Sequence, residues 1–306
     1  MAPESVFDHV ILLVPHEQLV SPPHWLSDAF TILDGGVHEG GLTENKLVVF
    51  QDGVYLELIA FVDGASPQHR AMHPWGKQPE GRIIHWAHTI LNHEEGQGSK
   101  ATEQSFRAVQ ARIEDAKVGI KYLDPEPGFR TMADGSKRIW ANAIPSFDDY
   151  EGPVWINQLP FWTFDRTPRS LRVPATPENT AHPSGVVGVA AVSLFVKDKQ
   201  TVENMVPFYD AIFNEAAVEE TPSDNVERCR WDAAAPAHGE FGKRRFFLYH
   251  AVEDAFTEEE MAEAGGDVPD IFIKLSLYTK GEAGTVKGRF VKGTLITFEL
   301  IPTTSP

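Results

Sequence analysis

The sequence predicts an α+β protein built from repeated units, each with the order strand, helix and three strands. An apolar run over residues 6–14 recurs in outline at 82–91 and at 186–196. Asp52-Gly53 joins two apolar runs, which is the strongest hairpin signal in the chain. Residues 99–117 place Phe106, Val109 and Ile113 at helical spacing. We therefore expect a domain over 1–165 with two such βαβββ units, an extended connector over 166–185, and a related C-terminal unit over 186–306.

The first unit spans residues 6–61. Residues 6–14 are apolar on both alternating faces, as in a strand that is covered on both sides. Pro22-Pro23 suits the first turn of a helix that runs through Phe30, because proline is tolerated only there. Residues 29–33 are a candidate second strand, and LVVFQ and VYLELIAF on either side of the Asp-Gly turn complete the unit.

The second unit spans residues 82–165. Its first strand is RIIHWAHTIL at 82–91, its helix is 99–117, and its remaining strands are expected at 120–123, 138–144 and 154–164, the last interrupted by Pro160. The connector 166–185 is rich in Pro, Thr and Ser.

The third unit begins with VVGVAAVSLFV and continues with a helix over 201–213 and strands at 246–252, 271–279 and 294–300. It has no histidine at its start, so we expect it to hold no second metal. Whether it packs against the first two units or against a partner chain in a homodimer is left open.

Composition narrows the class of protein. A hydrophobic share of 42% and a charged share of 23% are ordinary for a globular protein. The formal net charge of −17 argues against binding to nucleic acid or to an anionic membrane. The single cysteine, Cys229, excludes a disulfide within the chain and a thiolate-rich zinc site. No signal peptide or long apolar stretch is evident, so a soluble cytoplasmic protein with a small-molecule substrate is expected.

A carboxylate in an otherwise apolar strand suggests a site. Glu57 lies in VYLELIAF, where an ionised carboxylate is costly unless it is paired or bound to a metal. By strand alternation His9 shares a face with Phe7, Ile11 and Leu13, and His85 shares one with Ala87. Two imidazoles and one carboxylate can hold Zn, Fe, Mn or Ni with positions open for substrate. The alternative is that His9 is a hydrogen-bonded core histidine and that Glu57 pairs with a basic group.

Several stretches resemble one protein family. FDHVILLVP, GGVHEGGLTENKLVVFQDGVYLELIAF, GFRTMADGSKRIWANAI, NQLPFWTFD and AHPSGVVGV, within residues 5–190, resemble the glyoxalase-like domain family of the vicinal oxygen chelate superfamily. The resemblance implies paired βαβββ units that form a U-shaped barrel, with metal ligands on the first and last strands of each unit. These would be His9, Glu57 and His85. The fourth position offers only Thr163, Phe164 or the following Asp165, which departs from a glyoxalase I-type set of four ligands and leaves the three-ligand set of ring-cleaving dioxygenases.

Other residues are candidates for substrate binding. Thr43 and Asn45 could bond a substrate carbonyl or satisfy local backbone groups. Arg130 could bind an anionic group through two parallel hydrogen bonds or form a surface ion pair. His38, in a glycine-rich loop, is a candidate proton shuttle. Aromatic residues that could line a pocket or pack in the core are Trp86, Trp162, Trp140, Trp155 and Phe161.

These observations favour a divalent-metal-dependent lyase or isomerase over a ring-cleaving dioxygenase, with His9, Glu57 and His85 as ligands and with Glu57 and His9 in catalytic roles. Two alternatives require no metal. One is a protein that sequesters a hydrophobic small molecule, and the other is an acid–base catalyst that uses His9 or Glu57.

Overall fold

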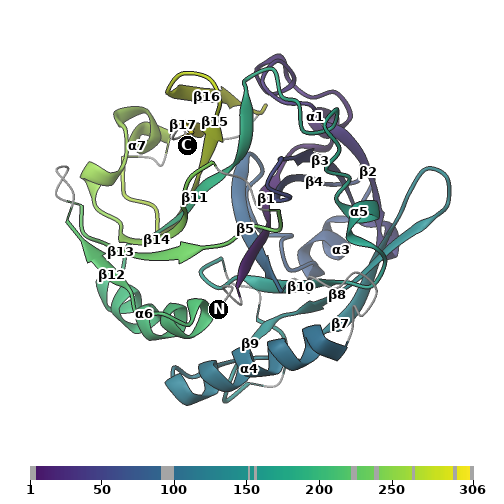
Figure 1. Ribbon diagram of the computed structural model, residues 1–306. Coiled ribbons are helices and arrows are strands. Elements are labelled where there is room, and N and C mark those ends of the chain that lie inside the picture. The colour runs from purple at the N-terminus through teal and green to yellow at the C-terminus, as the bar shows by residue number, and fades with distance from the viewer. Residues whose placement is uncertain are drawn as a thin grey trace.

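A closed barrel and an open sheet lie side by side in the computed structural model (Figure 1). The structure describes residues 5–90, 100–150, 152–154, 157–221, 226–237, 241–263, 266–291 and 295–303. The predicted α+β class is confirmed. No helix in the described part of the chain is long and apolar enough to cross a bilayer.

The first two units form the barrel, whose eight strands close on themselves in the order β1-β4-β3-β2-β7-β8-β10-β5. The strands are β1 (Val6–Leu13), β2 (Leu33–His38), β3 (Thr43–Val49), β4 (Tyr55–Phe61), β5 (Arg82–Thr89), β7 (Glu126–Thr131), β8 (Lys137–Ala143) and β10 (Phe161–Asp165). Strands β2 and β7 pair through Val37 and His38, and this contact closes the sheet.

The first unit agrees with the sequence prediction except before β3. The Asp-Gly hairpin is present, with β3 and β4 antiparallel and Gly53 at φ 77°. The predicted helix from Pro22-Pro23 through Phe30 is the shorter α2 (His24–Ser27), and an unpredicted short helix, α1 (His16–Val20), precedes it. The second strand is β2 and not residues 29–33. Its glycines suggested a loop, but Gly35 is needed because a Cβ there would lie 2.3 Å from the backbone oxygen of Asn45.

The second unit contains β5 and the helix α4 (Lys100–Ala116) as predicted. The predicted strand at 120–123 is β6 (Ile120–Tyr122), which pairs with β9 (Pro145–Phe147) outside the barrel. In the barrel, the position predicted for residues 120–123 belongs to β7. The sequence of β7, EPGFRT, contains turn residues, so no strand was predicted there. Strand β10 begins only after Pro160.

The C-terminal sheet repeats the plan of the barrel without closing. Its strand order is β12-β13-β14-β11-β15-β17-β16. The strands are β11 (Val186–Val196), β12 (Val218–Glu220), β13 (Arg228–Ala233), β14 (Arg244–His250), β15 (Ile271–Thr279), β16 (Gly284–Arg289) and β17 (Leu295–Pro302). With the helix α6 (Lys199–Phe213), β11 to β14 complete a third βαβββ unit. Strands β15 to β17 follow as a partial fourth unit, whereas the sequence assigned β15 and β17 to the third.

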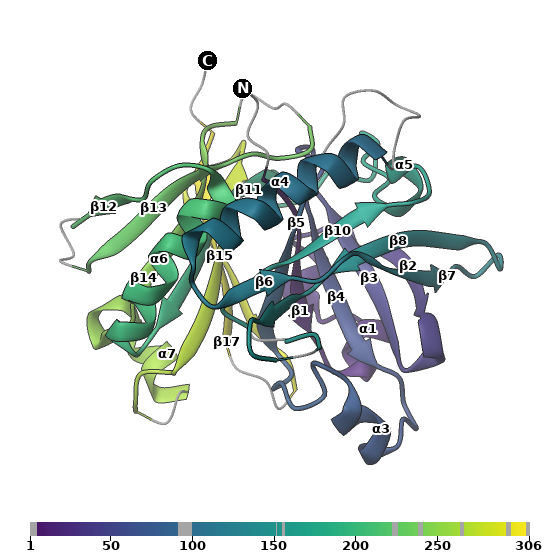
Figure 2. The ribbon, with the colours of Figure 1, turned by 90° about the horizontal axis from the view of Figure 1, so that it is seen from below.

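The barrel and the open sheet share a core. Trp86 of β5 stacks on Phe246 of β14 with ring centroids 5.5 Å apart. Helices α4 and α6 run next to each other (Figure 2), and Arg112 Nε donates to the carbonyl of Ala211 at 3.0 Å. The third unit therefore packs against the first two.

Asp52, in the hairpin turn, fastens the barrel to the open sheet. Its fully buried carboxylate accepts from the backbone N–H of Val54 at 3.1 Å and of Val189 in β11 at 2.9 Å. It also accepts from Arg244 Nε of β14 at 3.2 Å.

Candidate active site

A cavity of about 210 Å³ is lined by barrel strands and by the segment that follows α3 (Pro67–Met72). The polar residues that line it include His9, His38, Thr43, Asn45, Tyr55, Glu57, Arg130 and Arg172. Large aromatic residues that line it are Trp75, Phe129, Trp140 and Phe161. The polar groups come mainly from β1 to β4, so the first unit supplies most of the potential chemistry.

A β-bulge in β1 brings Asp8 and His9 together. In the pairing of β1 with β5, Phe7 lies opposite His88 and His9 opposite Ala87, which leaves Asp8 as the extra residue. Phe7 consequently joins the core outside the barrel while Ile11 faces inside, so the prediction that Phe7 and His9 share a face is wrong. His9 Nδ1 lies 2.6 Å from Asp8 Oδ1, a contact that regular strand alternation would forbid.

Asp8 is held as a carboxylate by two arginines of the short helix α5 (Arg169–Arg172), inside the predicted extended connector. Arg172 donates from Nη1 and Nη2 to the two oxygens of Asp8, both at 2.8 Å, and Arg169 Nη1 donates to Oδ2 at 2.5 Å. Burial would raise the pKa of Asp8, but the two guanidinium groups hold it well below its usual range. Because an ionised carboxylate only accepts, His9 Nδ1 donates to Asp8 and Nε2 faces Glu57.

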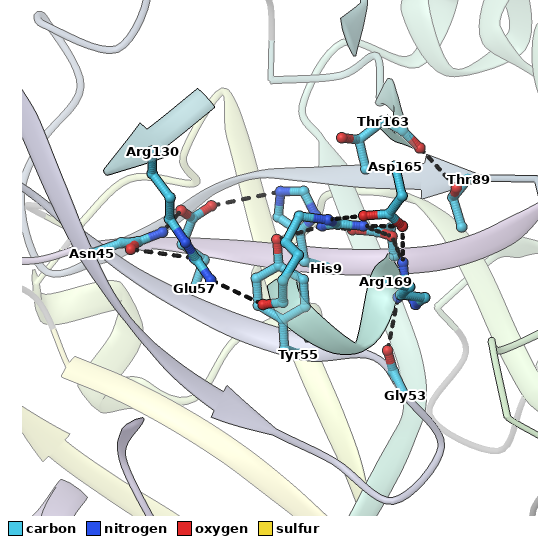
Figure 3. A network of polar contacts seen from close by, with 12 residues as sticks. His9, Asn45, Gly53, Tyr55, Glu57, Thr89, Arg130, Thr163, Asp165 and Arg169 are labelled. Atoms are coloured by element: carbon cyan, nitrogen blue, oxygen red, sulfur yellow. Dashed lines mark hydrogen bonds and ion pairs between the residues drawn. The ribbon is translucent and has the colours of Figure 1, made fainter. Parts of the chain in front are cut away.

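Glu57 lies between three polar partners, two of which Figure 3 shows on either side of it. Asn45 Nδ2 donates to its Oε1 at 2.5 Å, His9 Nε2 lies 3.5 Å from Oε2, and His38 Nε2 lies 3.5 Å from Oε1. Burial raises the pKa of Glu57, but the hydrogen bond from His38 and the charges of the two histidines outweigh it and lower the pKa to about 2. Two histidines and one asparagine therefore compensate this buried carboxylate.

The compensation of the Glu57 charge should appear in the pH dependence of the free energy of unfolding. The pKa of Glu57 falls from 4.5 to about 2 on folding, so its ionised form stabilises the fold above about pH 4.5 and that stability is lost as pH falls towards 2. We expect wild type to lose about 3 kcal/mol more of its free energy of unfolding between pH 6 and pH 2 than Glu57→Gln does. Urea denaturation at pH 6, 4, 3 and 2 measures this difference, and parallel pH profiles of the two proteins would contradict it.

The predicted metal ligands do not assemble around one point. His9 and Glu57 are brought together, but the residue across from His9 on β5 is Ala87, and His85 pairs with Ile11. His85 Nε2 donates to the carbonyl of Leu159 at 2.7 Å, and burial lowers the pKa of His85 to about 4.

The last barrel strand also offers no metal ligand to the cavity. Strand β10 presents Phe161 and Thr163, while Asp165 accepts from Arg172 Nε at 2.5 Å. Among the described residues, no three His, Cys, Asp or Glu side chains are arranged to hold a metal ion. The predicted set of His9, Glu57 and His85 therefore does not fit, in the described structure, the metal that the resemblance implies.

The predicted substrate-binding residues divide into two groups. Thr43, Asn45 and Arg130 line the cavity, and Thr43 Oγ1 bonds His38 Nδ1 at 2.9 Å. Trp86 and Trp162 do not line it, because they are fully buried in the core outside the barrel. In β10 alternation turns Phe161 and Thr163 inward and Trp162 outward. Trp140 and Phe161 line the cavity, and Trp155 lies outside the described residues.

The sequence did not predict four features of the site. Asp8 was missed because the bulge cannot be read from the sequence of one strand. Arg172 was missed because its segment was predicted to be an extended connector. Tyr55 stacks on His9 with ring centroids 4.7 Å apart, and Trp75 enters from the segment after α3. The spacing of arginines in RTPRSLR, directly after Asp165, is a signal that could have indicated a buried ion-pair cluster.

Comparison with known proteins adds a family and a fold. Residues 7–213, more than half of the chain, match the model of a family described as glyoxalase-like domain. A hypothetical protein from Staphylococcus aureus has a similar structure, with a TM-score of 0.61, 15% sequence identity, and coverage of 97% of this chain and 100% of that one. At this identity the likeness shows the fold alone.

Two solved enzymes are weaker matches, and at these TM-scores they support no argument. Glyoxalase I from Zea mays has a TM-score of 0.38 and 13% identity, covering 81% of this chain and 68% of that one. The 2,2',3-trihydroxybiphenyl 1,2-dioxygenase from Sphingomonas wittichii strain RW1 has a TM-score of 0.43 and 9% identity, covering 97% and 90%. No curated protein matches the sequence.

Proposed function

The chain belongs to the glyoxalase-like domain family, and from this premise we propose that it is an isomerase or lyase that moves a proton on a small oxygenated molecule without a bound metal. The observation that supports the proposal is the line of contacts from Asp8 through His9 to Glu57 on the wall of the cavity. A carboxylate that orients a histidine, which in turn faces the reacting group, is a recurring arrangement in acid–base catalysis.

His9 is the group that would accept or donate the proton. Its Nδ1–H is fixed by Asp8, so Nε2 is the nitrogen that a bound molecule meets. Nε2 and the ionised Glu57 lie 3.5 Å apart, and both are acceptors unless a proton lies between them. A proton taken from a substrate carbon by Nε2 can therefore be shared with Glu57 and returned at another atom.

Tyr55 would stabilise the negative charge that develops on a substrate oxygen. Burial raises the pKa of Tyr55, so the phenol keeps its proton. The Tyr55 oxygen accepts from Arg172 Nη1 at 2.9 Å, which leaves its O–H to donate elsewhere. Because Tyr55 lines the cavity next to His9, this O–H can serve as a fixed donor to an enolate oxygen.

Ring cleavage by a dioxygenase is the less suitable alternative. That chemistry requires a bound metal, and among the described residues no three His, Cys, Asp or Glu side chains are arranged to hold one. The acid–base proposal uses only side chains that are already in contact.

Hydrogen exchange in deuterated water tests the proposal. A panel of 2-hydroxy ketones, 2-oxo acids and aldehydes is incubated with the protein, and loss of the C–H signal next to the carbonyl is followed by proton NMR. We expect exchange with at least one member, reduced about 100-fold or more in His9→Gln. His16→Gln is the matched control, since His16 bonds Glu44 at 2.7 Å and does not line the cavity.

Two results would overturn the proposal. One is exchange that disappears on treatment with a chelator and returns with added Zn, Fe, Mn or Ni, as a metal-dependent enzyme would show. The other is tight binding of panel members without exchange of any of them, as expected for a sequestering protein.

A further inference from the structure

Arg130 is a buried cation with too few partners. Its side chain, on β7, is 2% exposed and lines the cavity. Within the described part of the chain it makes two hydrogen bonds: Nη1 donates to Asn45 Oδ1 at 3.4 Å, and Nη2 donates to the carbonyl of Arg172 at 2.9 Å. Its Nε is buried and has no acceptor among the residues that the structure describes. Three of the five N–H groups of this guanidinium therefore have no acceptor among the described residues.

The contrast with Arg172 shows what a compensated guanidinium looks like in the same barrel. Arg172 makes five hydrogen bonds, two to Asp8, two to Asp165 and one to Tyr55. Arg130 makes no ion pair with any described carboxylate, and both of its acceptors are neutral amide oxygens. A buried charge with no carboxylate in direct contact is costly, and the charge of Glu57 reaches Arg130 only across Asn45, so a bound anion would complete the surroundings of Arg130.

The other walls of the cavity restrict the anion. The carboxylates of Glu39 and Glu57 line the same space, so a ligand with two or more negative charges would be repelled. Phe129, Trp140 and Phe161 give the cavity flat apolar surfaces. The planar fork of an arginine matches a carboxylate through two parallel hydrogen bonds.

We propose that the ligand of this cavity is a monocarboxylate with a small planar or apolar body, and that Arg130 is the counterion of its carboxylate. This rests on the proposed function of the same cavity and specifies its substrate class. Asn45 connects the two parts, because its Oδ1 accepts from Arg130 while its Nδ2 donates to Glu57 (Figure 3). A carboxylate bound at Arg130 would thus lie one side chain away from the pair that moves the proton.

Benzoate and its neutral isostere benzamide are suitable probes. Binding is measured by titration calorimetry, with tryptophan fluorescence as a second readout because Trp75 and Trp140 line the cavity. We expect benzoate to bind about tenfold or more tightly than benzamide, and Arg130→Gln to remove this preference. Arg138→Gln is the control, since Arg138 lies opposite Arg130 in the β7–β8 pairing but does not line the cavity.

Failure of benzoate to bind, equal binding of the two probes, or an Arg130→Gln protein that keeps the preference would overturn the inference. If Arg130→Gln does not fold, Arg130→Lys replaces it. Lysine keeps the charge but loses the fork, so about tenfold weaker benzoate binding supports the inference and unchanged binding overturns it. Benzoate binding requires no proton transfer. Benzoate binding that depends on Arg130, in a protein that catalyses no hydrogen exchange, would therefore contradict the proposed function alone. Hydrogen exchange that depends on His9, in a protein that shows no preference for benzoate, would contradict this inference alone.

Discussion

Replacing Arg172 with methionine is expected to lower the free energy of unfolding by about 3–5 kcal/mol. Arg172 is 2% exposed, and all five of its N–H groups are used by Asp8, Asp165 and Tyr55. Methionine fills similar space but leaves the fully buried carboxylate of Asp8 with Arg169 as its remaining cation. Urea denaturation at pH 7 measures the loss.

Two further variants show whether the loss comes from the charge on Asp8. Arg138→Met makes the same change at a half-buried arginine, and we expect it to cost about 0.5 kcal/mol or less. Adding Asp8→Asn to Arg172→Met removes the uncompensated charge, so the double variant should lose less than the sum of the single losses. Additive losses, or equal losses in Arg172→Met and Arg138→Met, would contradict the explanation.

Asp52→Ala is expected to lower the free energy of unfolding by a similar amount, about 3–5 kcal/mol. The substitution removes the acceptor of the Val54 and Val189 N–H groups and the counterion of Arg244, all at a fully buried position. The same denaturation experiment measures the effect. The exposed Asp34, which pairs with Lys46 at 3.1 Å, provides the control Asp34→Ala, with an expected loss of about 0.5 kcal/mol or less. A loss in Asp52→Ala no larger than in this control would show that the two sheets are held by packing alone.

The parts of the fold that sequence predicted well are those with uninterrupted periodicity. Strand β11 and strand β15 have the predicted ends, and α4 begins and ends within a residue of the predicted limits. Strands β2 and β7 were missed because Gly35, Gly36, Pro127 and Gly128 look like turn residues, although the barrel uses them where strands approach closely or bend.

The candidate site was predictable only where strand alternation holds. Alternation allowed His9 and Glu57 to face the same side if the first unit curls, and the structure brings them to 3.5 Å. It could not place Asp8, because a bulge is a feature of pairing between strands and leaves no mark in one strand's sequence. Nor could alternation show that Ala87 lies opposite His9 on β5 while His85 lies opposite Ile11, since register is set by contacts along the whole sheet.

Helix α5 sets a lower limit on how far this protein can be shortened. The last barrel strand ends at Asp165, which suggests cutting the chain there to obtain a minimal fragment that contains the cavity. Such a fragment would keep His9 and Glu57 but lose Arg169 and Arg172, and with them the cations that keep Asp8 ionised. An engineer who wants the cavity without the C-terminal half must therefore carry the α5 residues along or redesign the acid that they neutralise.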